Sequence, residues 1–332
     1  MRNLVTGVKS PPSGRSGGLQ KEKLSAKAMG FVKILLRTLF LLGMGYVMLY
    51  PILFALSGAF KARVDVYDPT VIWLPKHYSM EAMNLAVKSL KFWDALKQTL
   101  IILIPSVCLQ MISTLMAGYA FARFKFRERG ILFAGLIFTI IVPVQNLIVP
   151  LYANFQSFDM FGLGYLYSLF SGGSLPNLLN TPFPFYLMAA FGMGIRSGLY
   201  IFIMRQFFRN MPPELEEAAL IDGCSPLQTY LRVMLPNAVM VMVTVFMFSL
   251  VWHWNDAYTT SILSPNNRTL SVALSDLRIV VYRLNDAGGD DPVITQVRVQ
   301  AGALLSILPM LILFLFTQKA FTESIERTGI VG

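Results

Sequence analysis

The chain is poor in charge, histidine and cysteine. Only 14% of its 332 residues are charged whereas 55% are hydrophobic, so it could not present the polar surface of a soluble protein and needs lipid around it. The two cysteines, Cys108 in an apolar stretch and Cys224 in a polar loop, are predicted to form no disulfide. The two histidines, His77 and His253, join no cluster with the spacing of metal ligands, so we expect no bound metal.

The residue patterns of enzyme active sites are missing as well. The phosphate-binding pattern Gly-x-x-x-x-Gly-Lys-Ser/Thr does not occur, so any ATP hydrolysis is expected on a separate polypeptide, which would bind the ATP and Mg²⁺. No Ser/His/Asp set or carboxylate pair lies within an apolar stretch, which argues against an intramembrane hydrolase. We therefore predict no catalytic residue and no cofactor on this chain. The net charge of +10 does not indicate nucleic acid, because the basic residues flank apolar stretches without interleaved aromatics.

Long apolar stretches are what the chain does contain. Each is close to the roughly 20 residues that cross a hydrocarbon core as a helix. The sequence therefore predicts an all-α membrane protein with six transmembrane helices, which places both termini on one side. The predicted spans are 32–57, 99–121, 131–154, 184–208, 237–256 and 301–318.

The distribution of Lys and Arg predicts which side is the cytoplasm. The tail 1–30 and the segment 122–130 are rich in both residues, whereas 156–181 contains neither. By the positive-inside rule the termini are cytoplasmic, and 156–181 and 257–300 are external. The external assignment of 58–98 runs against the rule, which weakens for a loop of this length. The tail, with its Gly, Pro and Ser, is expected to be flexible, and residues 31–332 to form the membrane domain.

A polar segment, 211–236, interrupts this pattern between the fourth and fifth spans. Pro212 and Pro213 begin a short helix with acidic residues in its first turn, where they complement the helix dipole. Ala218, Ala219 and Asp222 share one face of that helix, and small side chains there would let a partner approach closely. Gly223 is expected to end the helix, since glycine accepts the left-handed conformation. We interpret the segment as a docking element.

The segment resembles the EAA loop of the membrane permeases of ABC importers, whose pattern is Glu-Ala-Ala, three residues, Gly, nine residues, a branched apolar residue, one residue, then Leu-Pro. Further matches favour the carbohydrate-uptake branch: Gln145 with Pro150-Leu151-Tyr152, Trp254-Asn255, and Gly329 with Gly332. The resemblance covers about residues 31–332 and implies the type I (MetI-like) permease fold. The residues it implies for ATPase coupling are Glu214, Glu217, Ala218, Ala219, Asp222, Gly223, Leu235 and Pro236.

The resemblance also implies the partners and the compartment. A permease of this kind works in the bacterial cytoplasmic membrane beside a second, similar permease, two ATPase subunits and an extracellular solute-binding protein, and its loop 257–300 would contact that protein. The implied solute is an oligosaccharide or a polysaccharide fragment, a step that rests on analogy. A rival hypothesis is a membrane signalling or scaffold subunit that docks a cytoplasmic partner through the same loop without moving solute.

Polar and aromatic residues at membrane depth are candidates for the solute path. Aromatic faces pack on sugar C–H groups and amides bond to hydroxyls, but an aromatic belt at the membrane surface explains the tryptophans equally well. Arg196 lies either in the path or at an interface, and Gly192, Gly194 and Gly198 around it permit close helix packing. The candidates are Gln145, Asn146, Tyr152, Arg196, Trp252, Trp254 and Asn255.

Overall fold

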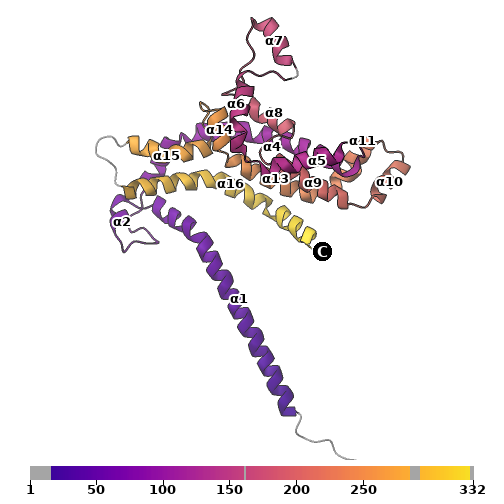
Figure 1. The fold of residues 1–332 in the computed structure, drawn as a ribbon. Coiled ribbons are helices and arrows are strands. Elements are labelled where there is room, and N and C mark those ends of the chain that lie inside the picture. The colour runs from indigo at the N-terminus through magenta and orange to yellow at the C-terminus, as the bar shows by residue number, and fades with distance from the viewer. Residues whose placement is uncertain (1–15, 161, 285–291, 330–332) are drawn as a thin grey trace, which may run out of the picture.

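The computed structural model describes residues 16–160, 162–284 and 292–329, and Figure 1 shows these residues folded into helices joined by short loops. The described residues contain no strand, and their one isolated β-bridge pairs Lys61 with Tyr78. The predicted all-α class is confirmed. The helices are α1 Ser16–Ala59, α2 Arg63–Tyr67, α3 Glu81–Leu90, α4 Phe92–Arg123, α5 Arg129–Ile141, η1 Val144–Asn146, α6 Ile148–Gln156, α7 Leu163–Ser171, α8 Phe183–Ala190, α9 Ser197–Asn210, α10 Glu214–Ile221, α11 Pro226–Thr229, η2 Tyr230–Met234, α12 Leu235–Asn237, α13 Val239–Trp254, α14 Tyr258–Leu263, α15 Leu270–Leu284 and α16 Pro292–Gly329.

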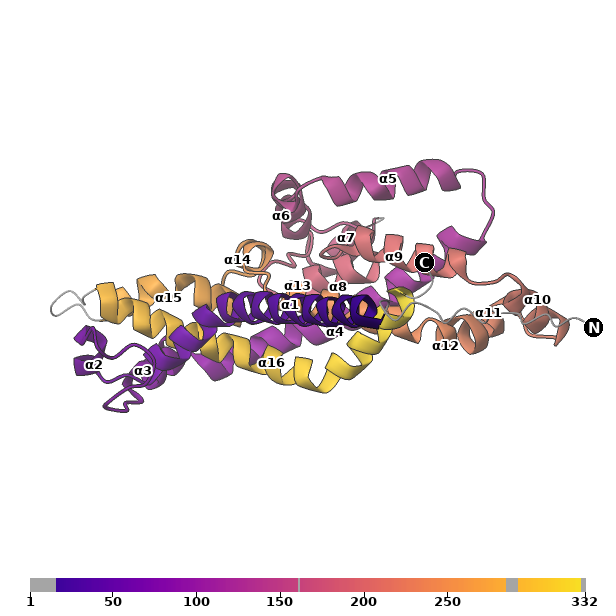
Figure 2. The ribbon, with the colours of Figure 1, turned by 90° about the horizontal axis from the view of Figure 1, so that it is seen from below.

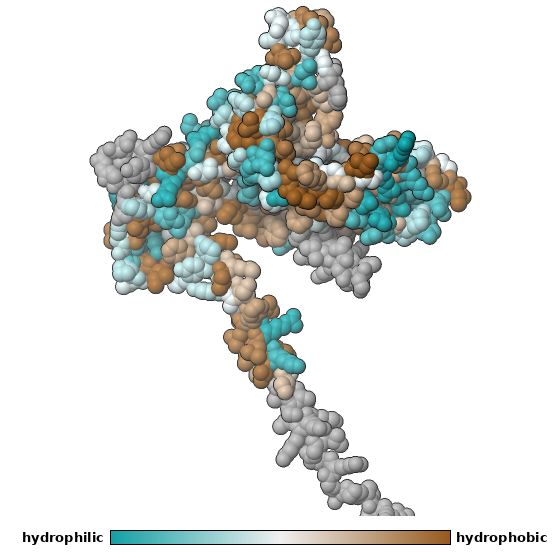
Figure 3. Space-filling model, viewed as in Figure 1, coloured by the Kyte–Doolittle hydropathy of each residue, from teal (hydrophilic) through white to brown (hydrophobic). Residues whose placement is uncertain are grey.

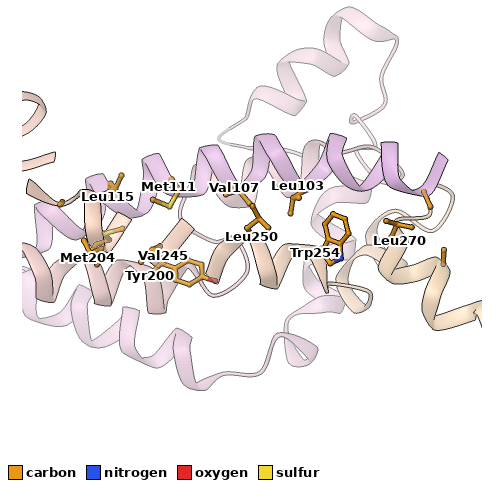
Figure 4. Close-up of a cluster of buried hydrophobic side chains, with 14 of the residues drawn as sticks. Leu103, Val107, Met111, Leu115, Tyr200, Met204, Val245, Leu250, Trp254 and Leu270 are labelled. Atoms are coloured by element: carbon orange, nitrogen blue, oxygen red, sulfur yellow. The ribbon is translucent and has the colours of Figure 1, made fainter. Parts of the chain in front are cut away.

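Helix α4 forms the centre of the bundle and packs against α8, α9 and α13. Its buried apolar residues recur every fourth position, which keeps them on one stripe of the helix. In Figure 4 this stripe faces side chains of α9 and α13, and these side chains form the main buried cluster of the described residues. The stripe consists of Leu103, Val107, Met111 and Leu115, and it meets Tyr200, Met204, Val245 and Leu250.

Three described helices are long and apolar enough to cross a membrane: residues 29–59 of α1, all of α4 and residues 292–319 of α16. A fourth candidate is the pair 226–237 and 239–254, which bends by 76°. Helix α5 is apolar but has only 13 residues. Helices occupy all six predicted spans, and the membrane placement of the shorter ones stays a prediction.

Two of the predicted spans are broken. The stretch 131–154 is divided between α5, η1 and α6, because Pro143 lacks the N–H that would continue α5 and holds Val142 in an extended conformation. The stretch 184–208 is divided between α8 and α9 by residues 191–196, where Gly192 and Arg196 have φ of 69° and 59°. A broken span exposes backbone groups that neighbouring helices must satisfy.

The predicted flexible tail 1–30 needs a correction. Helix α1 begins at Ser16, so the second half of that tail is helical, while residues 1–15 lie outside the described residues. The run Lys21 to Ala28 consists largely of good helix formers, which extend the helix of the first span toward the N-terminus. In Figure 1, α1 leaves the other helices and extends as a separate arm. Its apolar window has no buried residue, as expected of a helix that faces lipid or a partner.

Of the three loops predicted to be external, 58–98 and 257–300 lie together at one end of the bundle, whereas α7 of loop 156–181 lies away from that end in Figure 1. Figure 2 shows α2, α3 and α15 at one end and α10, α11 and α12 at the other, and which end faces the cytoplasm stays a prediction. In loop 257–300, α15 is ordered because Leu270, Ala273, Leu277 and Val281 form a buried stripe, and the helix contacts α3, α4 and α16. The middle of this loop, 285–291, lies outside the described residues.

Candidate functional site

The polar segment 211–236 forms two short helices with a glycine corner between them. Helix α10 begins after Pro213 and carries Glu214, Glu216 and Glu217 in its first turn. It ends where Gly223 adopts a φ of 85°, and a Cβ built on this glycine would meet no atom within 4 Å. The glycine is therefore required by its backbone conformation alone, and not by space. This agrees with the predicted end of the helix.

The chain then returns to the bundle through a capped and distorted helix. Ser225 accepts a hydrogen bond from the backbone N–H of Gln228, whose side chain accepts from the backbone of Ser225, so that α11 starts with a complete capping box. The π-helical turn η2 follows directly, with the N–H of Leu235 bonded to the carbonyl of Tyr230. Pro236 comes next and supplies no N–H to the helix. The segment is thus locally well defined.

The exposed side chains of this segment combine acids with large apolar groups. Glu214, Glu217, Ala218 and Asp222 are exposed, as predicted for a docking face, and so is Pro236. Ala219 is only 5% exposed and packs inward, so it is not part of that face, and Leu235 is half-buried. Figure 3 shows the hydrophilic residues gathered at this end of the molecule. The exposed large apolar residues are Leu215, Leu220, Ile221, Leu227 and Leu231, with Ile221 exposed by 86%.

Glu216, which the sequence did not single out, anchors α10 to the end of α4. Its Oε1 accepts a 2.9 Å hydrogen bond from the hydroxyl of Tyr119 and lies 3.4 Å from Nε of Arg123. The side chains of Glu216 and Arg123 are only 19% and 14% exposed, so solvent screens this contact little. Glu216 and Glu217 therefore lie on different sides of α10, one turned toward the bundle and one toward solvent.

The same end of α4 contacts both ends of the polar segment. Arg123 Nη2 donates a 2.7 Å hydrogen bond to the carbonyl of Met211, just before α10. The ring of Tyr119 lies 4.7 Å from that of Tyr230 in η2 and 5.4 Å from that of Phe208 in α9. A displacement of the polar segment would act on α4 through these contacts.

Of the candidate path residues, the structure brings Arg196 and Trp252 together. The guanidinium carbon of Arg196 lies 4.3 Å from the centroid of the Trp252 ring, within the range of a cation–π contact. Both side chains are exposed, with Trp252 exposed by 44%. The pair links the break between α8 and α9 to the far end of α13.

The remaining path candidates are placed apart from this pair. Trp254 is buried in the main cluster and its indole N–H donates to the carbonyl of Ser306, which favours a role in helix packing. Asn255 is exposed and donates to the carbonyl of Val251. Gln145, Asn146 and Tyr152 are exposed on η1 and α6. Among the described residues no hydrogen bond or ring contact joins these three to Arg196 or Trp252.

A buried polar group on α4 holds the break in the fourth span, and sequence reasoning missed it. The amide nitrogen of Gln110 donates to the carbonyl of Ile195 at 2.8 Å and to Oγ of Ser197 at 2.6 Å. Its oxygen accepts a 2.5 Å hydrogen bond from Oγ of Ser249 on α13. Gln110 is fully buried. A glutamine in the middle of a predicted span was the available signal, because a buried polar side chain there needs partners.

The family of the chain follows from comparison with known proteins. Residues 111–325, more than half of the chain, match the family model described as the inner membrane component of binding-protein-dependent transport systems. The chain belongs to this family. The resemblance to ABC importer permeases is thereby confirmed, and the chain is a subunit of a membrane transport system.

Curated relatives include permeases named for carbohydrates. The chain is 25% identical over 83% of its length, and 89% of the relative's, to the probable starch degradation products transport system permease protein AmyC of Thermoanaerobacterium thermosulfurigenes. It is 23% identical over 86% of its length, and 92% of the relative's, to the diacetylchitobiose uptake system permease protein DasC of Streptomyces coelicolor. The names of these two relatives agree with the resemblance to the carbohydrate-uptake branch.

A solved structure supports the fold. The chain superposes with a TM-score of 0.63 and 20% identity on a chain in the crystal structure of a bacterial ABC transporter involved in the import of the acidic polysaccharide alginate. The alignment covers 94% of this permease and all of the other chain. At this identity the likeness speaks for the fold alone.

Proposed function

We propose that this permease is one membrane subunit of an ATP-driven, binding-protein-dependent importer in the bacterial cytoplasmic membrane, with six spans and both termini in the cytoplasm. It would form half of the solute pathway beside a second, similar permease, and would assemble with two ATPase subunits and an extracellular solute-binding protein. The observation that carries the proposal is the segment 211–236, a defined helical element that offers Glu217 and Ile221 to solvent while Glu216 ties it to α4.

The proposed mechanism is alternating access driven from this segment. Exposed acids such as Glu217 would pair with basic residues of the ATPase, and the exposed Leu220 and Ile221 would fill an apolar groove on it. Closure of the two ATPase subunits would move α10 as a rigid body. The contacts of Glu216 and Tyr119 would pass that movement to α4, so that the pathway opens outward to receive solute and inward to release it.

Oligosaccharides or polysaccharide fragments are the solutes we propose. The names of the relatives in Thermoanaerobacterium and Streptomyces support this class. The pairing of an exposed aromatic face with an exposed cation at Arg196 and Trp252 also suits a saccharide, since aromatic rings pack on sugar C–H groups.

Reconstitution tests the proposal. The permease is co-expressed with the neighbouring reading frames of its operon, the complex is purified and placed in proteoliposomes, and ATP-dependent uptake of labelled saccharides is measured. Glu217→Ala is expected to lower ATPase co-purification, and exposed Arg209→Ala, which lies outside segment 211–236, serves as its matched control. Co-purification of a kinase or adaptor without any ATPase, and without uptake, would instead support the signalling or scaffold role.

A further inference from the structure

The cation–π pair of Arg196 and Trp252 sits at membrane depth. Arg196 precedes α9, whose 14 residues rise by about 21 Å to Asn210 at the end near segment 211–236. Trp252 lies 13 residues after Val239, the start of α13, or about 20 Å from the same end of the molecule. The two distances, one along α9 and one along α13, agree. In the proposed topology both side chains therefore lie within a hydrocarbon core about 30 Å thick.

The side chain of Arg196 has no acidic partner and no hydrogen bond among the described residues, although a charge at this depth is costly. The guanidinium carbon of Arg196 lies over the ring of Trp252, and both side chains stay exposed. The N–H donors along the edge of the plane are therefore free. That edge matches the planar, two-oxygen geometry of a carboxylate.

The surrounding helices hold this pair in a fixed arrangement. Gln110 bonds to the carbonyl of Ile195 and the hydroxyl of Ser197, the residues on either side of Arg196. The same amide group accepts from Ser249, three residues before Trp252 on α13. Arg196 itself has a φ of 59°, a conformation that a non-glycine residue keeps only when its surroundings enforce it. An arrangement of this kind is typical of a preorganised binding site.

We propose that Arg196 and Trp252 form a subsite for an acidic saccharide, in which Arg196 binds a carboxylate of the solute and the open face of Trp252 packs on its sugar ring. The inference rests on the proposed transport function and narrows its solute to sugars that carry a carboxylate. A single carboxylate, with one negative charge, suits the site, because the sequence from 177 to 204 offers no Lys or Arg besides Arg196. A phosphate dianion would demand a second cation.

Chemical modification of the intact complex in membranes tests the subsite directly. Phenylglyoxal labels exposed arginines, and mass spectrometry reads Arg196 and Arg209 separately, with exposed Arg209 at the other end of α9 as the internal control. We expect at least fivefold slower labelling of Arg196 with millimolar trigalacturonate, no effect of maltotriose, and unchanged labelling of Arg209. Protection by both sugars or by neither overturns the proposal. So does an Arg196 that resists labelling without sugar, because a partner or lipid would then cover it.

Uptake into proteoliposomes separates this inference from the proposed function. We expect the wild-type complex to take up trigalacturonate faster than maltotriose. In Arg196→Gln the uptake of trigalacturonate should fall at least tenfold, while the uptake of maltotriose stays within twofold of the wild type. Arg196→Lys should retain part of the preference for trigalacturonate. An equal loss of uptake for both sugars in Arg196→Gln would show that Arg196 has a merely structural role and would overturn the subsite. Import of maltotriose alone would overturn the subsite and leave the proposed function intact, whereas a complex that imports neither sugar fails both.

Discussion

The contact between Glu216 and the end of α4 predicts how strongly α10 is attached to the bundle. Glu216 accepts a hydrogen bond from Tyr119 and faces Arg123, and both charged side chains are mostly shielded from solvent. A hydrogen bond to a charged group contributes about 1.5–3 kcal/mol, and its loss leaves the partner groups without a replacement. Because both side chains keep 14% and 19% exposure, the lower part of this range applies, and Glu216→Ala should weaken the attachment of α10 by about 1.5–2 kcal/mol. This is a factor of about 10–30 in the population of detached helix.

Amide hydrogen exchange on the purified permease measures that population without any partner protein. Exchange in residues 214–222 should become about 10–30 times faster in Glu216→Ala, because local opening limits exchange there. Glu217→Ala is the matched control, since Glu217 lies in the same turn but is exposed. Glu216→Ala and Tyr119→Phe together should cost less than the sum of their separate effects. Equal exchange rates in Glu216→Ala and Glu217→Ala would refute the anchoring role of Glu216.

The other predictions concern the corner, the topology and the loop 58–80. Gly223→Val should abolish solute-stimulated ATP hydrolysis while the protein still inserts, because a branched residue is strained at a φ of 85°. Gly223→Asn should retain most of the stimulated hydrolysis, because asparagine tolerates that conformation. Normal stimulation in Gly223→Val would contradict this reasoning. With both native cysteines replaced by serine, a cysteine at exposed position 74 should react from outside the cell and one at exposed position 221 only from inside; reaction of both from one face would exclude the six-span topology. Hydrogen bonds from the backbone N–H and the ring of His77 lower the pKa of Asp65, so Asp65 stabilises the loop at pH above about 4 and loses this effect as the pH falls through its lowered pKa. Within the acidic range in which pepsin is active, the enzyme should cut residues 61–79 of the wild type only below the lowered pKa of Asp65, and those of Asp65→Ala at every pH in that range. Cutting of the wild type that does not change with pH in this range would count against the role of Asp65.

The sequence predicted the apolar helices and the polar segment because both are local properties. A run of apolar residues long enough to span is visible without knowing its neighbours, and so is the glycine that ends α10. The break at residues 191–196 was not predicted, because its stability depends on Gln110, which lies 85 positions from Ile195 in the sequence. The tail was predicted too long for a similar reason, since hydropathy marks the lipid-facing part of a helix and not its end.

For neighbouring residues of the same type, it was hardest to predict from the sequence which one faces the core and which one does not. Trp252 and Trp254 were grouped as path candidates, yet two positions along a helix turn the side chain by about 200°, so one tryptophan faces Arg196 and the other the core. Glu216 and Glu217 differ by about 100°, and only the position of Tyr119, 97 residues away, decides which of them is turned inward. Residue type alone does not show which of two neighbouring side chains faces the core.

Helix α4 connects these separate observations. Tyr119 and Arg123 at one end hold the coupling segment, and Gln110 lies nine residues before Tyr119, about 13 Å along the helix. Because Gln110 bonds to both sides of Arg196, a shift of α4 that α10 imposes would also move the groups that hold the proposed carboxylate subsite. Under the proposed mechanism, then, one rigid helix would let the state of the ATPase alter the binding of the solute, since side chains of α4 contact both the coupling segment and the residues that hold the proposed subsite.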